Sequence, residues 1–213
     1  MDRNQLLFLL GGLKWTLALS AIGFVVGAIA GLGVALARTS GHRMLERRTA
    51  GYIALFQGTP LLMQLFVAYY GLALLGLKLD AWVAVSIGFT LHASAYLGEI
   101  WRGSIEAVPR GQSEAAKALS LNYVSRMMDV VLPQAIRISL PATIGFLVQL
   151  IKGTSLAAII GFTELMRAGT MVSNQNFKPL LVLGVVGVFY FTICWPLSFY
   201  GARLERRLAT AAR

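Results

Sequence analysis

The chain has 213 residues, of which 57% are apolar and only 13% are charged. Soluble domains carry about 25% charged residues, so this chain has too few polar side chains to cover a water-facing globule. The composition excludes a soluble globular protein and predicts that lipid covers much of the surface. The formal net charge of +10 raises the question of a nucleic-acid partner, which depends on where the cations lie.

Apolar residues gather in five long runs that carry almost no charge. A bilayer core of roughly 30 Å needs about 20 apolar residues in a helix. We therefore expect five transmembrane helices, at about residues 13–37, 54–77, 81–101, 138–162 and 179–202. Buried helices of a soluble protein are the alternative, and five repeats of such length argue against it. No cleavable signal peptide is evident, so the first span is expected to act as its own insertion signal.

Two small details of these runs have structural meaning. Gly27 and Gly31 form a GxxxG pair, which allows close helix packing but also arises often by chance in glycine-rich spans. Cys194 in the last run is the only cysteine, so we expect no intrachain disulfide and no metal cluster.

The cations are distributed unevenly between the two ends of the spans. With five spans, the richer side holds three groups: Arg38, Arg43, Arg47 and Arg48; Arg102, Arg110, Lys117, Arg126 and Arg137; Arg203, Arg206, Arg207 and Arg213. The other side holds Arg3, Lys14, Lys78, Arg167 and Lys178. Because the richer side is usually cytoplasmic, the N-terminus is predicted outside and the C-terminus in the cytoplasm. This role in orientation accounts for the basic charge without a nucleic acid.

One long polar stretch, residues 103–141, separates the third and fourth spans. It is longer than a helix connection needs. Ser113 is a suitable N-cap, Glu114 follows in the first turn, and the alanines after it favour a helix. Pro133 and Pro141 predict a break before the fourth span. The short helix is expected either to offer a small-residue surface to a protein partner or to rest on lipid headgroups.

This stretch resembles the EAA loop of ABC importer permeases, with Glu114-Ala115-Ala116 followed by Leu132-Pro133. Further blocks in the same order are similar to the polar amino acid permeases of the histidine/glutamine type: GTPLL at 58–62, QL at 64–65, AYLGEIWRG at 95–103, VPRGQ at 108–112, LPQAIR at 132–137 and KGTSL at 152–156. Together they cover nearly the whole chain. The resemblance implies a single transmembrane domain over residues 1–213, with the type I ABC importer fold, in the bacterial inner membrane.

In that family the loop helix docks on a cytoplasmic ATPase and transmits its closing motion. The resemblance implies a coupling loop at about 103–137, with the ATPase contact at Glu114, Ala115, Ala116, Leu119 and Ser120. It also implies a second permease chain, two ATPase subunits and an extracytoplasmic solute-binding protein. The chain has no GxxxxGK[ST] phosphate loop, so ATP and Mg²⁺ are expected on the ATPase and no cofactor on this chain.

Four positions depart from the family pattern. Ser120 and Gln57 replace a usual Gly and Arg, while Gly145 and Gly153 stand where Asn and Asp are common. Three of these changes remove polar or charged groups near the expected path. We therefore hypothesise that the chain pairs with a different, homologous permease that supplies more of the solute contacts.

Several polar side chains inside the spans are candidates for lining a solute path: Gln57, Thr59, Gln64, His92, Gln149, Lys152, Thr154 and Ser155. Each of the uncharged ones is also able to serve as an interhelical hydrogen bond. Lys152 is suited to a solute carboxylate, and the alternative is that it snorkels or pairs locally. Two i,i+3 pairs are expected at span ends: Glu99 with Arg102, and Glu164 with Arg167 in contact with a binding protein or solvent.

These observations favour an ABC importer permease for a polar amino acid, with a basic amino acid or an opine fitting equally well. The alternative is an ion-driven secondary transporter or channel subunit, against which the absence of an evident repeat and the presence of the docking loop argue. A membrane enzyme is disfavoured because no convergent acid, base, nucleophile or metal set is found.

Overall fold

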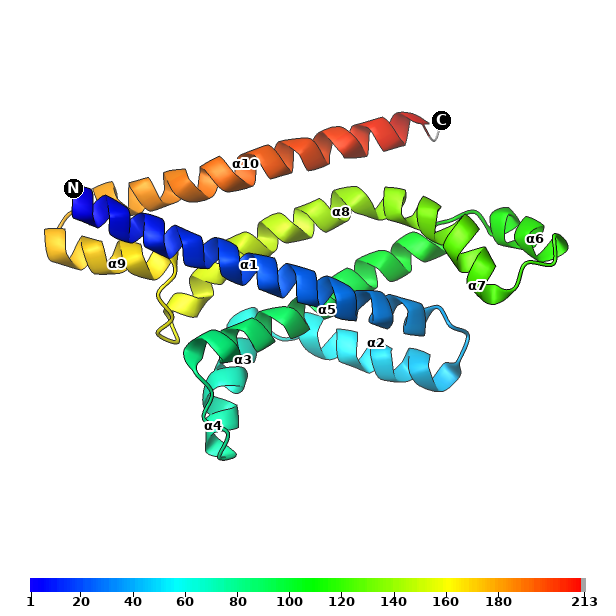
Figure 1. Cartoon of the computed structure of the whole chain (residues 1–213), viewed down its shortest axis with the longest axis horizontal. Coiled ribbons are helices and arrows are strands. Elements are labelled where there is room, and N and C mark those ends of the chain that lie inside the picture. The colour runs from blue at the N-terminus through cyan, green and yellow to red at the C-terminus, as the bar shows by residue number, and fades with distance from the viewer. Residues whose placement is uncertain (212–213) are drawn as a thin grey trace.

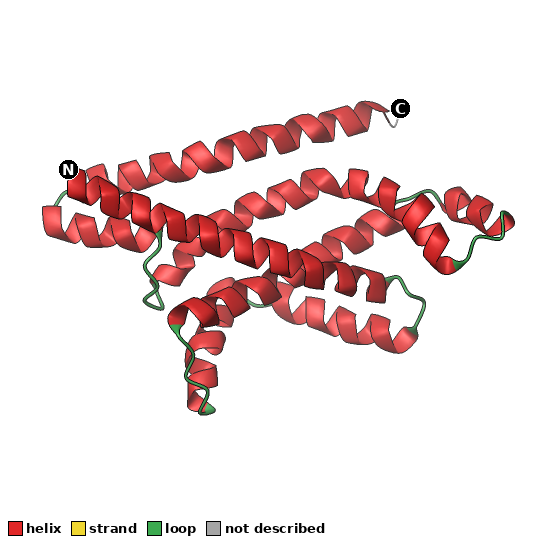
Figure 2. Ribbon diagram, viewed as in Figure 1, coloured by secondary structure: helices red, strands yellow, loops and turns green. Residues whose placement is uncertain are grey.

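The computed structural model of the chain describes residues 1–211, and the side chains of residues 1–208. Arg213, counted above among the C-terminal cations, lies outside this part. Helices and short connections make up the described chain, which contains no strand (Figures 1 and 2). The helices are α1 (Arg3–Arg38), α2 (Arg43–Gln57), α3 (Leu61–Phe66), α4 (Leu72–Leu74), α5 (Ala81–Glu106), α6 (Arg110–Ala118), α7 (Tyr123–Ser125), α8 (Leu132–Gly153), α9 (Leu165–Asn176) and α10 (Pro179–Ala211). Two π-helical segments, Val67–Gly71 and Arg126–Val131, and a 3₁₀ segment, Thr154–Ala158, join some of them without a break.

Four helical stretches in residues 1–211 are long and apolar enough to cross a membrane: Arg3–Arg38, Ala81–Glu106, Tyr123–Ala158 and Pro179–Leu208. A fifth crossing results if α2 and the segment Leu61–Leu74 are counted together, although the chain bends by 102° between them. The prediction of an all-helical membrane protein is confirmed, and the predicted second span is a bent helix pair.

The second span is not the continuous helix predicted over residues 54–77. Pro60 has no amide hydrogen and disfavours helix in the residue before it, so α2 ends at Gln57 and α3 begins at Leu61. Two side chains replace the main-chain hydrogen bonds lost at the bend. Thr59 Oγ1 donates to the Leu55 carbonyl at 2.7 Å, and Gln64 Nε2 donates at 2.7 Å to the Phe56 carbonyl, which the amide of residue 60 would otherwise reach.

The predicted break at Pro133 and Pro141 is wrong. The helix runs from Tyr123 to Ala158, longer than the predicted span 138–162. Pro133 lies at the junction of the π-helical segment and α8, where the helical hydrogen-bond pattern changes, so its missing amide does not break the helix. Pro141 lies inside α8, and a membrane helix accommodates such a proline through its neighbours.

Two further boundaries differ from the sequence prediction. The loop helix α6 begins at Arg110 after Pro109, so Ser113 lies inside the helix and is not its N-cap. The amphipathic helix α9 between the last two spans was not predicted, because its polar and apolar residues alternate without a long apolar run.

The core is built on close packing of α1 against α5. A Cβ atom added at Gly27 would lie 2.5 Å from the Ala93 Cβ, and one at Gly31 would lie 3.1 Å from the Leu97 Cβ. The GxxxG pair therefore does mark a close helix contact. On the outside, large apolar side chains such as Ile29, 72% exposed, and Leu180, 92% exposed, form the lipid-facing surface.

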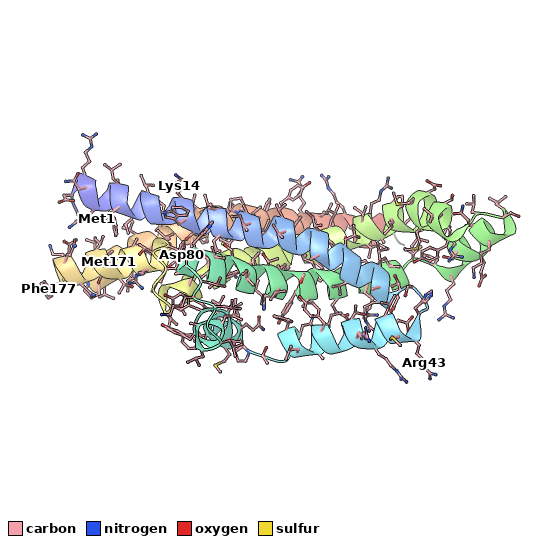
Figure 3. All side chains as sticks on the ribbon, turned by 60° about the horizontal axis from the view of Figure 1, so that its bottom comes forward. Met1, Lys14, Arg43, Asp80, Met171 and Phe177 are labelled. Atoms are coloured by element: carbon pink, nitrogen blue, oxygen red, sulfur yellow. The ribbon has the colours of Figure 1, made fainter. Side chains whose placement is uncertain are left out.

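The molecule has two distinct ends. The α1–α2 turn, α6 and the last turns of α10 lie at one end, and the N-terminus and α9 lie at the other (Figure 1). Figure 3 shows Arg43 at the end opposite to Met1 and Phe177. Within residues 1–211, the members of the three basic groups found in the sequence therefore gather at one end of the bundle.

Candidate functional site

A cavity with a mixed polar and apolar lining opens where the α2–α3 bend faces α5 and the C-terminal end of α8. Its volume is about 680 Å³. The bend contributes residues 57–61, α5 contributes His92 and Tyr96, and the α8 end contributes residues from Gln149 to Leu156. Because the backbone is broken at Pro60 and tightens to 3₁₀ geometry after Gly153, polar groups of both segments reach one space.

Six of the predicted path residues line this cavity: Gln57, Thr59, His92, Gln149, Lys152 and Ser155. The side chains of Gln57, Gln149 and Lys152 are exposed, and those of Thr59 and Ser155 are partly buried. These residues come from three segments, the outer two of which are about 90 positions apart in the chain, which supports reading them as one site rather than as separate helix contacts.

Two predicted path residues do not line the cavity. Gln64 lies behind the bend, where its amide nitrogen also donates to the Thr59 carbonyl and hydroxyl, each at 3.0 Å. Thr154 is fully buried and donates its hydroxyl to the Ile151 carbonyl at 2.7 Å. Both side chains stabilise irregular backbone beside the cavity.

His92 and Tyr96 supply the aromatic wall of the cavity. They lie one turn apart on α5, with ring centroids 4.5 Å apart. His92 was a sequence candidate, whereas Tyr96 was missed; the signal for it was its i+4 position on the same helix face. Within residues 1–211 no group of three metal-ligating side chains is present, and His92 is bonded through Nδ1 to Gln64 instead.

Lys152 gives the cavity its charge. It is the one cation among the lining residues, and within residues 1–208 its ammonium has no hydrogen bond or ion pair. The local-pairing alternative therefore finds no partner here. An exposed ammonium beside amides, hydroxyls and an imidazole is suited to a small polar solute that carries a carboxylate.

The loop helix α6 lies at the end of the molecule, beyond the spans (Figure 1). Of the predicted coupling residues, Glu114, Ala115, Leu119 and Ser120 are exposed, and Leu119 keeps 75% of its surface accessible. Ala116 is buried and faces the molecule, where α6 packs against the segment Arg126–Val131. One face of the helix is thus exposed, and the other packs against the segment that leads into α8.

The base of α5 carries the expected ion pair. Arg102 Nε donates to the Glu99 carboxylate at 2.9 Å, and the guanidinium also pairs with Glu106 one turn further on. The i,i+3 prediction is confirmed and extends to a three-residue chain of charges. Such partly exposed pairs stabilise a helix end by only a few tenths of a kcal/mol each.

Comparison with known proteins shows to which family the chain belongs. Residues 23–210 match the family described as "Binding-protein-dependent transport system inner membrane component". The chain belongs to this family. It is a permease, a multi-pass component of the bacterial inner membrane that takes part in transport and is not an enzyme.

Two relatives from Bacillus subtilis (strain 168) cover nearly the whole permease. The L-cystine transport system permease protein TcyB is 38% identical over 199 residues, which are 93% of this chain and 85% of that protein. The arginine transport system permease protein ArtQ is 34% identical over 205 residues, which are 96% of this chain and 94% of that protein.

Solved structures confirm the type I importer fold of the permease. A chain of an amino acid ABC transporter crystallised with histidines superposes with a TM-score of 0.87 at 30% identity, covering 97% of this chain and 99% of that one. A chain of the MetNI methionine ABC transporter, inward facing, shares the fold with a TM-score of 0.76 at 20% identity.

Away from the cavity, the permease buries one carboxylate completely. Glu164 caps α9 by accepting from the Met166 and Arg167 amides at 2.9 and 2.8 Å, and it also accepts from the hydroxyls of Thr16 at 3.2 Å and Tyr190 at 3.0 Å. Because its exposed fraction is 0%, the prediction of contact with solvent or a binding protein at Glu164 is wrong. Glu164 instead joins α1, α9 and α10.

Proposed function

We propose that this permease forms half of the transmembrane path for a polar amino acid or a related solute, with a basic amino acid or an opine within that class. The observation that carries the proposal is the cavity in which Lys152 lies beside the exposed amides of Gln57 and Gln149 and the partly buried hydroxyls of Thr59 and Ser155. A cation and neutral hydrogen-bonding groups complement the carboxylate and the polar remainder of such a solute. The named substrates of the relatives, cystine and arginine, belong to the same chemical class.

The second part of the proposal concerns energy coupling. We infer that Glu114, Ala115, Leu119 and Ser120 contact a cytoplasmic ATPase, with Ala116 supporting the helix from within. The support is the exposed face of α6 and its rigid attachment beside α8, the helix that also lines the cavity. Movement of α6 is then transmitted along one continuous helix to Gln149 and Lys152. ATP and Mg²⁺ bind to the ATPase, and no cofactor binds to this chain.

The proposed assembly contains two permease chains, two ATPase subunits and an extracytoplasmic solute-binding protein. The end that carries α6 faces the cytoplasm, so the N-terminus lies outside and the C-terminus inside. We further propose that the second permease is a different, homologous chain. A Cβ at Gly145 would meet nothing within 4 Å, so packing does not explain the loss of a polar side chain there. Full transport by a homodimer of this chain would contradict this pairing.

The function is tested with the complete complex in vesicles, using uptake of labelled L-arginine and L-glutamine. Uptake is expected to require ATP on the ATPase side and the binding protein on the other. Uptake by this chain alone under an ion gradient would instead establish the secondary-transporter alternative and overturn the proposal.

Coupling is tested by Glu114→Arg, which reverses a charge on the exposed face of α6. We expect ATP hydrolysis without solute uptake, because the ATPase contact is lost while insertion is unaffected. Glu205→Arg is the matched control, since it makes the same change on exposed α10 at the same end. Normal uptake in Glu114→Arg would refute the docking role.

A further inference from the structure

The orientation of the Gln64 amide follows from its neighbours. One end of the amide lies 2.7 Å from the Phe56 carbonyl and 3.0 Å from the Thr59 carbonyl. Carbonyl oxygens only accept hydrogen bonds, so this end must be the NH₂ group. The amide oxygen is therefore at the other end, where it lies 3.0 Å from Nδ1 of His92.

This orientation fixes the tautomer of His92. An amide oxygen only accepts, so Nδ1 of His92 must carry the proton and donate it to Gln64. In the neutral ring, Nε2 then carries a lone pair and acts as an acceptor. Free histidine has a pKa near 6.5, so the neutral ring predominates at neutral pH.

Nε2 is available to a ligand. Within residues 1–208 it makes no hydrogen bond. The fully buried side-chain nitrogen and oxygen atoms without a partner in this part of the chain are Arg38 Nε and Ser86 Oγ. Nε2 of His92 also has no partner and is not one of these atoms, so it retains some solvent exposure. His92 is only 6% exposed, and it lines the same cavity as Lys152. The small exposed part of the His92 side chain therefore includes Nε2, an acceptor to which no hydrogen-bond donor is bound.

The ring is also held in place. Tyr96 lies against one side of it with centroids 4.5 Å apart, and Phe146 is stacked at 6.2 Å. With Gln64 at Nδ1, the imidazole has little freedom to turn. A fixed acceptor requires less ordering when a ligand binds and gives more discrimination than a mobile one.

We propose that His92 is a specificity-determining residue, whose Nε2 accepts a hydrogen bond from the α-ammonium of the solute while Lys152 binds its carboxylate. The proposal rests on the proposed function and adds the recognised group. The cavity then presents one cation and one neutral acceptor to the two charged groups that all α-amino acids share. Gln64 takes no part in binding and acts as the positioning residue that holds the acceptor tautomer.

The tautomer is tested by ¹⁵N NMR on the purified permease–ATPase complex labelled at histidine. This chain has two histidines, so a His42→Gln background leaves His92 as its only labelled imidazole. Histidines of the second permease and of the ATPase are kept unlabelled by separate expression. We expect a protonated Nδ1 and an unprotonated Nε2, whose signal shifts when L-arginine or L-glutamine is added. A protonated Nε2 in the free complex, or no shift at saturating ligand, would overturn the proposal.

Recognition is tested by ligand binding to the same complex without the binding protein. L-arginine is compared with 5-guanidinopentanoate, which lacks only the α-ammonium, and L-glutamine with glutaramate. The native chain should prefer each amino acid by about tenfold or more, since a hydrogen bond from a charged donor has that effect. His92→Phe keeps the ring stacking, and should reduce this preference by about tenfold. His42→Phe makes the same change on an exposed histidine and should leave it unaltered.

The two levels of the proposal fail differently. If the native complex binds and transports neither amino acid, the proposed function fails. If it does both and His92→Phe keeps the full preference for the α-ammonium, only the role of His92 fails. The NMR measurement leaves His92 unmodified, so it decides the proposal even if His92→Phe does not fold.

Discussion

Ser120 follows the C-terminal end of α6, and its backbone lies in the left-handed region with φ of 58°. The Ser120 amide donates to the Lys117 carbonyl at 2.9 Å, and the Leu121 amide donates to the Ala116 carbonyl at 3.1 Å. This pair of bonds is the Schellman motif, whose left-handed position is usually glycine. The glycine common in the family therefore has a conformational reason, and serine stores strain beside the proposed ATPase contact.

We expect Ser120→Gly to stabilise the end of α6 by about 0.5–1 kcal/mol, because glycine adopts this conformation without a Cβ clash. Hydrogen exchange at the Leu121 amide should slow by about two- to fivefold. Ser120→Ala keeps the clash and should show no such slowing. Equal exchange rates in the glycine and alanine variants would show that serine is unstrained here.

The buried Glu164 carboxylate is stabilised by the number of hydrogen bonds that it accepts. Four groups donate to it, two of them backbone amides of α9 and two of them hydroxyls from α1 and α10. The Thr16 hydroxyl also accepts from the Leu165 amide at 3.1 Å, which closes the network. An amide side chain has one oxygen, so it leaves part of this set unpaired in a buried site.

Glu164→Gln should therefore destabilise the folded permease by about 2–3 kcal/mol. Cys194 is the only cysteine and is 9% exposed, so its reaction with a thiol-specific dye during heating reports unfolding. The variant should react at a lower temperature than the native chain. Glu205→Gln, on an exposed residue, is the control and should match the native curve. Unchanged melting of Glu164→Gln would mean that the network adds little stability.

Between elements, α1 and α5 approach each other closely because α1 carries glycine at the contact. Gly27 has no room for a methyl group, because its Cβ would lie 2.5 Å from the Ala93 Cβ and 3.1 Å from the Thr90 carbonyl. Gly33 lies on the same helix with nothing within 4 Å of the corresponding position. The two glycines therefore differ in packing while sharing a helix and a membrane.

Gly27→Ala should separate α1 from α5 and cost about 1–3 kcal/mol, because neither helix backbone is able to move freely. Gly33→Ala should be neutral or slightly stabilising, since alanine favours a helix. Thermal melting, monitored through the reactivity of Cys194, compares the two variants. Equal melting temperatures would contradict the close packing of these helices.

The sequence predicted the elements that depend on composition and missed those that depend on local backbone breaks. Long apolar runs gave the spans, because burying a helical segment in lipid needs length and hydrophobicity alone. The bend at Pro60 was missed because a proline inside an apolar run fits both a kink and a break. At Pro141 the same ambiguity led to the opposite error, and only neighbouring helices decide such cases.

The site was predicted in part for a related reason. Six lining residues were found because polar residues in apolar runs are few: Gln57, Thr59, His92, Gln149, Lys152 and Ser155. Gln64 and Thr154 belong to the same runs, yet their side chains bond to irregular backbone. The direction in which a side chain points after a bend or a 3₁₀ turn depends on geometry that residue spacing does not contain.

At the scale of the whole molecule, the uneven charge of the two ends predicts the orientation of the chain in the membrane. The α1–α2 turn, the segment from the end of α5 to the start of α8, and the end of α10 lie together and carry most of the cations of residues 1–211, while α9 and the N-terminus form the opposite end (Figure 1). Cationic segments are retained on the cytoplasmic side during insertion. The helix proposed to meet the ATPase lies at that end, so orientation and coupling depend on each other.

Single cysteines at the two ends test this orientation in a Cys194→Ser background. Met44→Cys lies at the start of α2 and Phe177→Cys at the end of α9, where the native side chains are 66% and 88% exposed. Neither change alters the charge that directs insertion. A membrane-impermeant thiol reagent added to spheroplasts should label Phe177→Cys at once, and Met44→Cys only after the membrane is opened. Labelling of Met44→Cys from outside would place α6 on the wrong side for a cytoplasmic ATPase, and the coupling proposal would fail with the orientation.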